Sequence, residues 1–241
     1  MHLSTFFRVS VAVLAMTTAV QAGAEAPEQI YKPGPHEGHS HLEYNGQIGE
    51  TNHAARPHAV ELFHGVSDGL ALGIAVESEA EDSHFKVEKI AIGALVGLTR
   101  EDAPVHAAML VMAGVTTDGN FPQLDTRLIL EHESGPWTAL GNVYWRRIDA
   151  HEKGTSLGYA ATLHHKIADH VSVGAEVSGQ AARLSGYSHG FDAAQYAGPS
   201  AIVSWDVAGG KEIEIGVKYL RRMDSGSTYR DTVRMAFGFA F

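Results

Sequence analysis

The 241-residue sequence contains no cysteine. Disulfide bonds are therefore excluded, and so is a lipid anchor attached through an N-terminal cysteine. Basic residues are also scarce, with 18 Lys and Arg against 28 Asp and Glu. A chain with this balance has no basic face to neutralise phosphates, which argues against a nucleic-acid partner.

Long apolar runs are missing after residue 24. The longest, IAIGALVGL and AAMLVMAGV, reach about half of the roughly 18 residues that a membrane-spanning helix requires. No Pro- or Ser-rich linker divides the chain either, so a single domain is expected.

Residues 1–24 have the order of a secretory signal peptide: a short start with Arg8, an apolar run and then small residues. Cleavage can follow Ala22 or Ala24, and we adopt the second. Export of a cysteine-free chain fits the envelope of a Gram-negative bacterium. The next segment, residues 25–40, carries three prolines and little that is apolar, so we expect a flexible periplasmic tail.

From residue 41 to residue 241, apolar and polar residues alternate with a period of two, and clusters of Gly, Asp, Asn and Ser interrupt the pattern. Short connections such as SDG and GGK alternate with longer polar ones such as SGYSHGFDAAQ. This pattern predicts an all-β transmembrane antiparallel up-and-down barrel of twelve strands, with ten as the alternative. The segments are 41–50, 58–66, 70–81, 85–98, 104–115, 122–132, 137–149, 155–166, 171–184, 195–207, 212–223 and 228–241. Alternation is poor in the fourth and fifth, where we expect a bulge or a shift by one residue.

The two faces of these segments differ in a way that indicates lipid outside and water inside. The apolar faces are rich in Val, Leu and Ala, whereas the opposite faces collect Gly, Ser and charges. In the last segment Phe237, Phe239 and Phe241 share one face, which we expect to meet lipid. The terminal aromatic resembles the assembly signal of outer-membrane barrels. It therefore predicts the barrel-assembly machinery as a partner, beside outer-membrane lipid and lipopolysaccharide.

Charged residues on the predicted inner faces form two groups. The second and third strands carry the acidic group, and the eleventh and twelfth carry the basic group. Because closure brings these strands near one another, the groups would set up a transverse field that selects small solutes. Alternatively they pair and fill the lumen, since barrels of about eight strands are filled by side chains and only about sixteen leave a wide channel. The residues are Glu61, Glu77, Glu79, Lys218, Arg222, Arg230 and Arg234.

Histidine is common in the predicted tail. His36, His39 and His41 are spaced closely enough to hold a divalent metal ion loosely, although a flexible segment lacks the geometry of a dedicated site. We expect no other cofactor.

Two serine and histidine combinations are the candidates for catalysis. Ser188 is adjacent to His189, and Ser156 is on the same predicted strand as His164. No nucleophile elbow or fixed spacing to an acid accompanies them, so we expect no enzyme, with an outer-membrane lipid-modifying enzyme as the alternative.

A strand-turn-strand phrase occurs three times, as VSDGLALGIAV at 66–76, IADHVSVGAEV at 167–177 and, more loosely, VAGGKEIEIGV at 207–217. The phrase resembles a hairpin of the outer-membrane barrels of the MetA-pathway phenol-degradation and transporter type. This chain departs from that pattern at His64, where an aromatic residue is usual, and at Gly69, where a basic one is usual. The resemblance implies an outer-membrane barrel that passes or binds small hydrophobic or metabolite-like molecules. We therefore expect a passive channel or transporter for small solutes.

Overall fold

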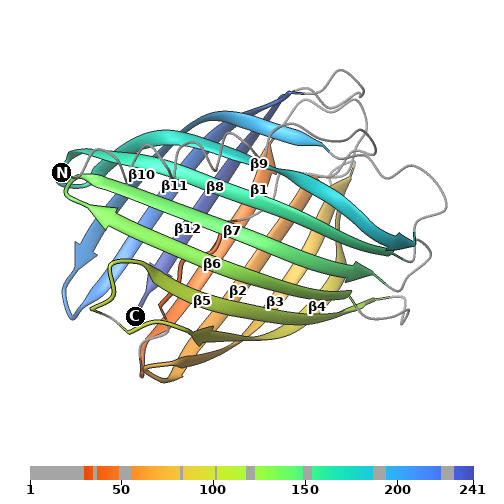
Figure 1. The fold of residues 1–241 in the computed structure, drawn as a ribbon, viewed down its shortest axis with the longest axis horizontal. Helices are drawn as coiled ribbons and strands as arrows, with labels where there is room; N and C mark the ends of the chain where they lie inside the picture. Colours follow the sequence, from red (N-terminus) through yellow and green to blue (C-terminus); the bar gives the residue numbers. More distant parts are fainter. Residues whose placement is uncertain are drawn as a thin grey trace.

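Twelve antiparallel strands form one closed barrel in the computed structural model (Figure 1). The structure describes residues 30–34, 37–48, 56–81, 84–100, 102–117, 123–148, 154–186, 194–223 and 231–241. The first six strands are β1 (Ser40–Ile48), β2 (Arg56–Ser67), β3 (Leu70–Glu81), β4 (His84–Gly97), β5 (His106–Thr116) and β6 (Gln123–Ser134). The others are β7 (Trp137–Ile148), β8 (Gly154–Ala168), β9 (Val171–Gly186), β10 (Gln195–Val207), β11 (Lys211–Arg222) and β12 (Asp231–Ala240). The predicted fold class and strand number are confirmed.

Each strand pairs with its neighbours in the sequence, and β1 pairs with β12 to close the ring. At this seam the amide of Ser40 donates to the carbonyl of Phe241 at 2.7 Å, and the amide of Phe241 donates back at 2.9 Å. Closure is required in hydrocarbon, because an open edge would leave a row of backbone groups without hydrogen bonds.

The tight turns lie at one end of the barrel, which we call the turn end. It holds residues 68–69, 135–136, 169–170 and 208–210 together with Ser40 and Phe241, which meet at one end of the seam, and it lies on the left in Figure 1. Gly135, Gly209 and Gly210 have positive φ, which glycine adopts without steric cost. The predicted long loops join the strands at the opposite end and are mostly outside the described residues.

The strand register contains irregularities, and one of them was expected. Between β3 and β4 it shifts at Glu77 and Ser78, which places a bulge in the segment where alternation is poor. Strand β5 is regular, and its buried and exposed residues alternate along its whole length. The three shifts between β8 and β9 were not predicted.

The exposed face of the wall is apolar. In β5 the side chains of Ala108, Leu110 and Met112 are buried, whereas Met109 and Val111 between them are exposed. No second layer covers the outside of a single-walled barrel, so the buried set faces the lumen and the exposed set faces lipid. The described residues contain no helix long and apolar enough to cross a bilayer.

Candidate functional site

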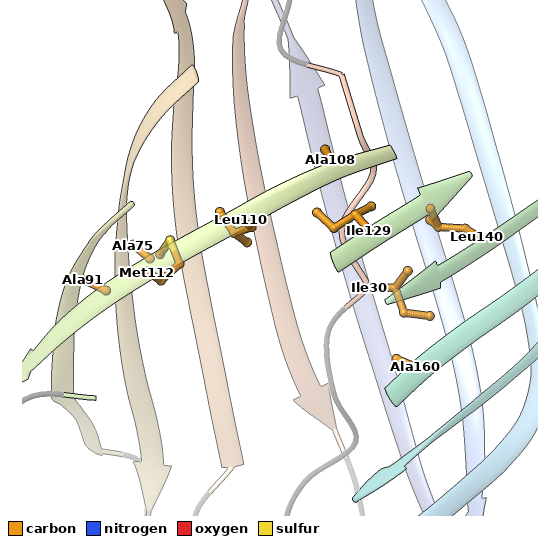
Figure 2. Packing of buried hydrophobic residues seen from close by; sticks show 9 residues of the cluster. All are labelled: Ile30, Ala75, Ala91, Ala108, Leu110, Met112, Ile129, Leu140 and Ala160. Atoms are coloured by element: carbon orange, nitrogen blue, oxygen red, sulfur yellow. The ribbon is translucent and has the colours of Figure 1, made fainter. Parts of the chain in front are cut away.

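The lumen is the candidate site, and residues 30–34, which precede β1, occupy part of it. Figure 2 shows the Ile30 side chain among Ile129, Leu140 and Ala160, all of which belong to one buried apolar cluster. We call residues 30–34 the lumen segment. The predicted flexible tail included these residues, and their contacts to the inner wall were not anticipated.

The cluster around Ile30 extends over one side of the inner wall. Its members come from β3 to β8 and are small or aliphatic, which makes this part of the lumen apolar. They are Ala75, Ala91, Ala108, Leu110, Met112, Ile129, Leu140 and Ala160, with Phe63 and Leu95 packed against them.

Tyr31 connects two sides of the barrel. Its amide donates to Oδ1 of Asn142 on β7 at 2.7 Å, and Nδ2 of Asn142 donates to its carbonyl at 3.0 Å. Its hydroxyl donates to Oε1 of Glu61 on β2 at 2.8 Å. Both partners are buried in the wall, with exposed fractions of 1% for Asn142 and 3% for Glu61. The lumen segment is therefore fixed by polar contacts as well as by apolar packing.

Lys32 attaches the lumen segment to a third strand of the wall. Its ammonium forms an ion pair with Glu214 on β11. Contacts from two successive residues, Tyr31 and Lys32, thus reach β2, β7 and β11, so the segment crosses the lumen and does not lie along one wall.

A cationic cluster lies beside Tyr31. Arg127 on β6 and Arg146 on β7 both donate to Asp125, with Nη2 to Oδ2 distances of 2.9 Å. The guanidinium of Arg127 lies 4.7 Å from the ring centroid of Tyr31 and 5.1 Å from that of Tyr144. Two guanidinium groups against one carboxylate leave this cluster with a net positive charge. Sequence reasoning missed it, although Asp125 and Arg127 share a face at spacing two.

The predicted acidic residues are found in different surroundings. Glu61 accepts the Tyr31 hydroxyl, whereas Oε1 of Glu77 lies 2.5 Å from Nζ of Lys89 on the neighbouring strand. The side chain of Glu79 is outside the described residues. The structure thus brings Glu61 to the lumen segment and gives Glu77 a partner on the adjacent strand.

The predicted basic residues occupy β11 and β12. Lys218 forms an ion pair with Glu176 on β9 at 2.5 Å, and Arg234 is opposite Lys218 in the register. Arg222 is buried, and Arg230 is outside the described residues. Glu77 and Lys218 thus form ion pairs with Lys89 and Glu176, which belong to neither predicted group. The effect of the two predicted groups on selectivity stays a prediction.

The inner wall carries a hydroxyl–imidazole–hydroxyl chain that runs from β8 to β10. His164 on β8 lies 3.0 Å from Thr162 Oγ1 through Nδ1 and 2.8 Å from Ser200 Oγ on β10 through Nε2. Gly174 of β9 is opposite both His164 and Ser200 in the register. A Cβ there would approach the His164 ring to 2.5 Å, so glycine leaves room for the ring to reach across.

Neither candidate combination of serine and histidine is found as a contact in the described part of the chain. Ser156 and His164 are eight positions apart on one strand, or roughly 26 Å at the rise of a β-strand. The histidine contacts Ser200 instead. Ser188 and His189 are outside the described residues.

Among the described residues, no three His, Asp or Glu side chains lie close enough to hold a metal ion together. Of the predicted metal ligands, His39 and His41 are described and His36 is not. Loose metal binding by the tail stays a prediction.

Polar groups without a hydrogen-bond partner among the described residues line the inner wall. They are buried oxygens of Gln47, Ser156, Ser178 and Thr232, on β1, β8, β9 and β12. A buried polar oxygen is costly unless it bonds to water or another group. This part of the wall therefore suits a hydrated lumen.

The closed barrel with its polar lumen has the fold of porin-like outer-membrane channels. An outer membrane channel from Pseudomonas putida F1 aligns with a TM-score of 0.61 at 11% sequence identity, covering 90% of this chain and 100% of that one. The NanC porin aligns with a TM-score of 0.57 at 8% identity, covering 83% of this chain and 98% of its own. The KdgM porin, in complex with disordered oligogalacturonate, aligns with a TM-score of 0.51 at 11% identity, covering 83% and 98%.

At sequence identities of 8–11%, the similarity to these channels is a similarity of fold alone. No protein-family model matches the sequence. No curated protein matches it either. The class defined by the fold is the transmembrane β-barrel of the porin-like type.

Proposed function

We propose that this protein is a passive channel of the bacterial outer membrane for small solutes, exported there by the signal peptide of residues 1–24. The observation that carries the proposal is a closed barrel with an apolar outer face and charged side chains inside. Such a wall separates lipid from an enclosed polar path. Similarity in fold to outer-membrane channels supports it.

The lumen favours amphipathic solutes. On one side the inner wall is apolar and includes Ala91 and Leu110. Elsewhere it carries ion pairs such as Lys218 with Glu176 and the cluster around Asp125. A solute with an apolar body and one polar group finds complementary surface on both sides. The resemblance to barrels of the phenol-degradation and transporter type supports the same class of solute.

The lumen segment narrows the path. Two successive residues, Tyr31 and Lys32, reach separate parts of the wall, so a solute must pass beside them or displace them. A narrow path in a twelve-stranded barrel excludes large solutes, because the interior is intermediate between filled and open barrels.

Planar-bilayer recording of the refolded mature chain tests the proposal. We expect discrete conductance steps of small amplitude, and we expect liposome swelling with small sugars or amino acids but not with oligosaccharides. A barrel that is folded by heat-shifted gel migration yet gives neither conductance nor swelling would overturn the channel function.

One contact favours a second candidate, hydrolysis of a solute in the lumen. Ser200 Oγ lies 2.8 Å from His164 Nε2, within the range of a nucleophile and its general base. The other ring nitrogen contacts the hydroxyl of Thr162 and no carboxylate, which leaves an imidazolium without the charge partner of a catalytic triad. Covalent labelling of Ser200 by a fluorophosphonate would support this candidate, and absence of labelling on the folded barrel would remove it.

A further inference from the structure

Charged side chains of the inner wall follow an order along the barrel axis. On β6, Glu131 lies nearer the turn end than Arg127, and on β11, Glu214 lies nearer the turn end than Lys218. In both strands the acid and the base are four positions apart, which is about 13 Å along a strand. Sequence reasoning separated acidic from basic residues across the lumen and did not find this axial order.

The seam repeats the same order. One register row carries Glu214 on β11 and Glu43 on β1, with a glycine of β12 between them. A second row, four positions farther from the turn end, carries Lys218, Arg234 and Gln47. Acidic and basic side chains therefore occupy two levels of the lumen, roughly 10 Å apart along the axis when the strands are tilted by about 40°.

Four carboxylates surround one ammonium at the level nearer the turn end. Besides its ion pair with Glu214, Lys32 interacts electrostatically with Glu212 and Glu43. Glu131, on the other side of the lumen, interacts with both Lys32 and Glu214. We call the four carboxylates the acidic zone. One cation leaves negative charge in excess there, and the partly exposed side chains of Lys32 and Glu214 show that the zone is open to a solute.

The level farther from the turn end carries an excess of positive charge, and we call it the basic zone. Its cations are Arg127, Arg146, Lys218, Arg222 and Arg234. Among the described residues, Asp125 pairs with the first two and Glu176 pairs with the third. Five cations thus face two carboxylates in this zone.

Two buried polar side chains lie beside Arg234. Gln47 is opposite it across the seam, and Thr232 is two positions away on the same face of β12. Their exposed fractions are 7% and 4%, and neither Oε1 of Gln47 nor Oγ1 of Thr232 has a hydrogen-bond partner among the described residues. A buried polar group of this kind takes its partner from water or a solute. The Thr232 hydroxyl beside a guanidinium provides the donors that a carboxylate accepts.

Opposite charges in series act differently on ions and on zwitterions. A solute with an ammonium group alone is attracted by the acidic zone and repelled by the basic zone, and a solute with a carboxylate alone meets the reverse. A zwitterion is attracted by both zones, provided that its ammonium group faces the turn end. The apolar side of the lumen around Leu110 suits a hydrocarbon chain between the two charged groups.

We propose that the acidic and basic zones together bind zwitterionic solutes in one orientation, with the ammonium group in the acidic zone and the carboxylate beside Arg234 and Thr232. The inference rests on the proposed function in one respect, that solutes reach the lumen. It deepens that function by naming the solute class as amino acids whose charged groups are separated by a hydrocarbon chain.

Calorimetric titration of the mature barrel, refolded in detergent, tests the solute class without any substitution. The probes are 6-aminohexanoate, hexylammonium, which lacks the carboxylate, and hexanoate, which lacks the ammonium group. We expect 6-aminohexanoate to bind about tenfold more tightly than either other probe, because each of them loses the hydrogen bonds of one charged group. Micelles without protein give the uptake by detergent. Equal affinities, or tighter binding of a singly charged probe, would overturn the proposal.

Lys32→Met assigns the ammonium group of the solute to the acidic zone. The lysine is in the lumen segment and not in a strand, and its tethered ammonium competes for the four carboxylates. We expect the substitution to tighten binding of 6-aminohexanoate and of hexylammonium by about tenfold, with no gain for hexanoate. Unchanged affinity for both ammonium probes would contradict binding in the acidic zone.

Arg234→Gln assigns the carboxylate of the solute to the basic zone. It should abolish the preference for 6-aminohexanoate over hexylammonium, whereas Arg221→Gln, at an exposed position on the opposite face of β11, should keep it. If Arg234→Gln does not refold, Thr232→Val, which keeps the side-chain shape, should weaken 6-aminohexanoate and hexanoate but not hexylammonium. A preference that survives these substitutions would overturn the orientation.

These titrations separate the inference from the channel function, because calorimetry requires no ion current. A barrel that prefers 6-aminohexanoate but conducts no current would refute the channel alone. A conducting barrel that binds the three probes equally would refute the zwitterion site alone.

Discussion

Lys218 and Glu176 form an ion pair at 2.5 Å although their strands, β11 and β9, are separated by β10. On β10 the residue opposite Glu176 is Gly198, whereas the residue opposite Lys218 is Ser200. The ammonium and the carboxylate therefore meet diagonally across this strand, beside a position that carries no side chain. Glu176 is fully buried, with an exposed fraction of 0%, and Lys218 is the cation that lies against its carboxylate.

Lys218→Met should destabilise the barrel by about 3 kcal/mol, because it leaves a buried carboxylate without its cation. Urea unfolding of the barrel in detergent measures the change, and Lys211→Met, at an exposed position beside a turn, is the control. The double variant Lys218→Met with Glu176→Leu should recover most of the loss. Equal unfolding midpoints for Lys218→Met and the Lys211 control would contradict a structural role for the pair.

Arg234→Glu should shift ion selectivity toward cations. Arg234 is opposite Lys218 in the register and opposite Gln47 across the seam, so its charge acts on the lumen. The reversal potential in a salt gradient measures the shift. Arg221→Glu is the matched control, since Arg221 is exposed beside Asp231 at 4.0 Å. An unchanged reversal potential in Arg234→Glu would count against the assignment of the Arg234 side chain to the lumen.

Asn142→Ala should increase single-channel conductance. The substitution removes both hydrogen bonds to the backbone of Tyr31 and so loosens the lumen segment. Asn45→Ala provides the comparison, because Asn45 is also buried but its amide donates to Glu43. If both variants conduct like the parent, the lumen segment does not limit the current.

Gly158→Ala should narrow the lumen. A Cβ at this position would lie 2.1 Å from Cζ of Tyr144, so the ring must leave its place along the wall. We expect a lower conductance and a loss of roughly 1–3 kcal/mol in stability from the crowding. Gly141→Ala is the control because nothing lies within 4 Å of its Cβ. Equal behaviour of the two variants would show that the Tyr144 ring moves without consequence.

Deletion of Phe241 should lower the yield of assembled barrel in cells. The residue makes both backbone hydrogen bonds to Ser40 at the seam, and its ring stacks on Phe239 with centroids 5.0 Å apart. The folded fraction is measured by heat-shifted gel migration of membrane extracts. Phe237→Leu keeps the apolar face and the backbone bonds, so it should assemble normally; equal loss in both variants would point to a general effect of hydrophobicity.

The strands could be predicted because side-chain burial repeats with a period of two. The segment 195–207 was predicted and is observed as Gln195–Val207, and the predicted 137–149 is observed as Trp137–Ile148. The alternation of apolar and polar side chains along a strand depends only on the local sequence and on which face of the wall contacts lipid. It does not fix bulges, whose positions depend on how two strands meet.

The lumen contacts could not be predicted because they depend on closure. Tyr31 meets Asn142, which is 111 positions away, only after the ring has formed around it. The sequence near Tyr31 offers a weak signal, an apolar, an aromatic and a basic residue between prolines. By contrast, the Asp125 and Arg127 contact joins residues two apart on one face, so the alternation that predicted β6 could have revealed it.

The seam between β1 and β12 has a consequence for how long the folded protein persists. Opening a closed ladder at any one place exposes two edges to hydrocarbon at once, at a cost of several kcal/mol for each group left without a bond. Fraying of a single strand is therefore suppressed, and we expect the barrel to unfold in one cooperative step. Among the described strands β1 is the shortest, and its ladders with β2 and β12 are the shortest in the ring, so we expect lengthening of these two interfaces to extend the lifetime of the folded state.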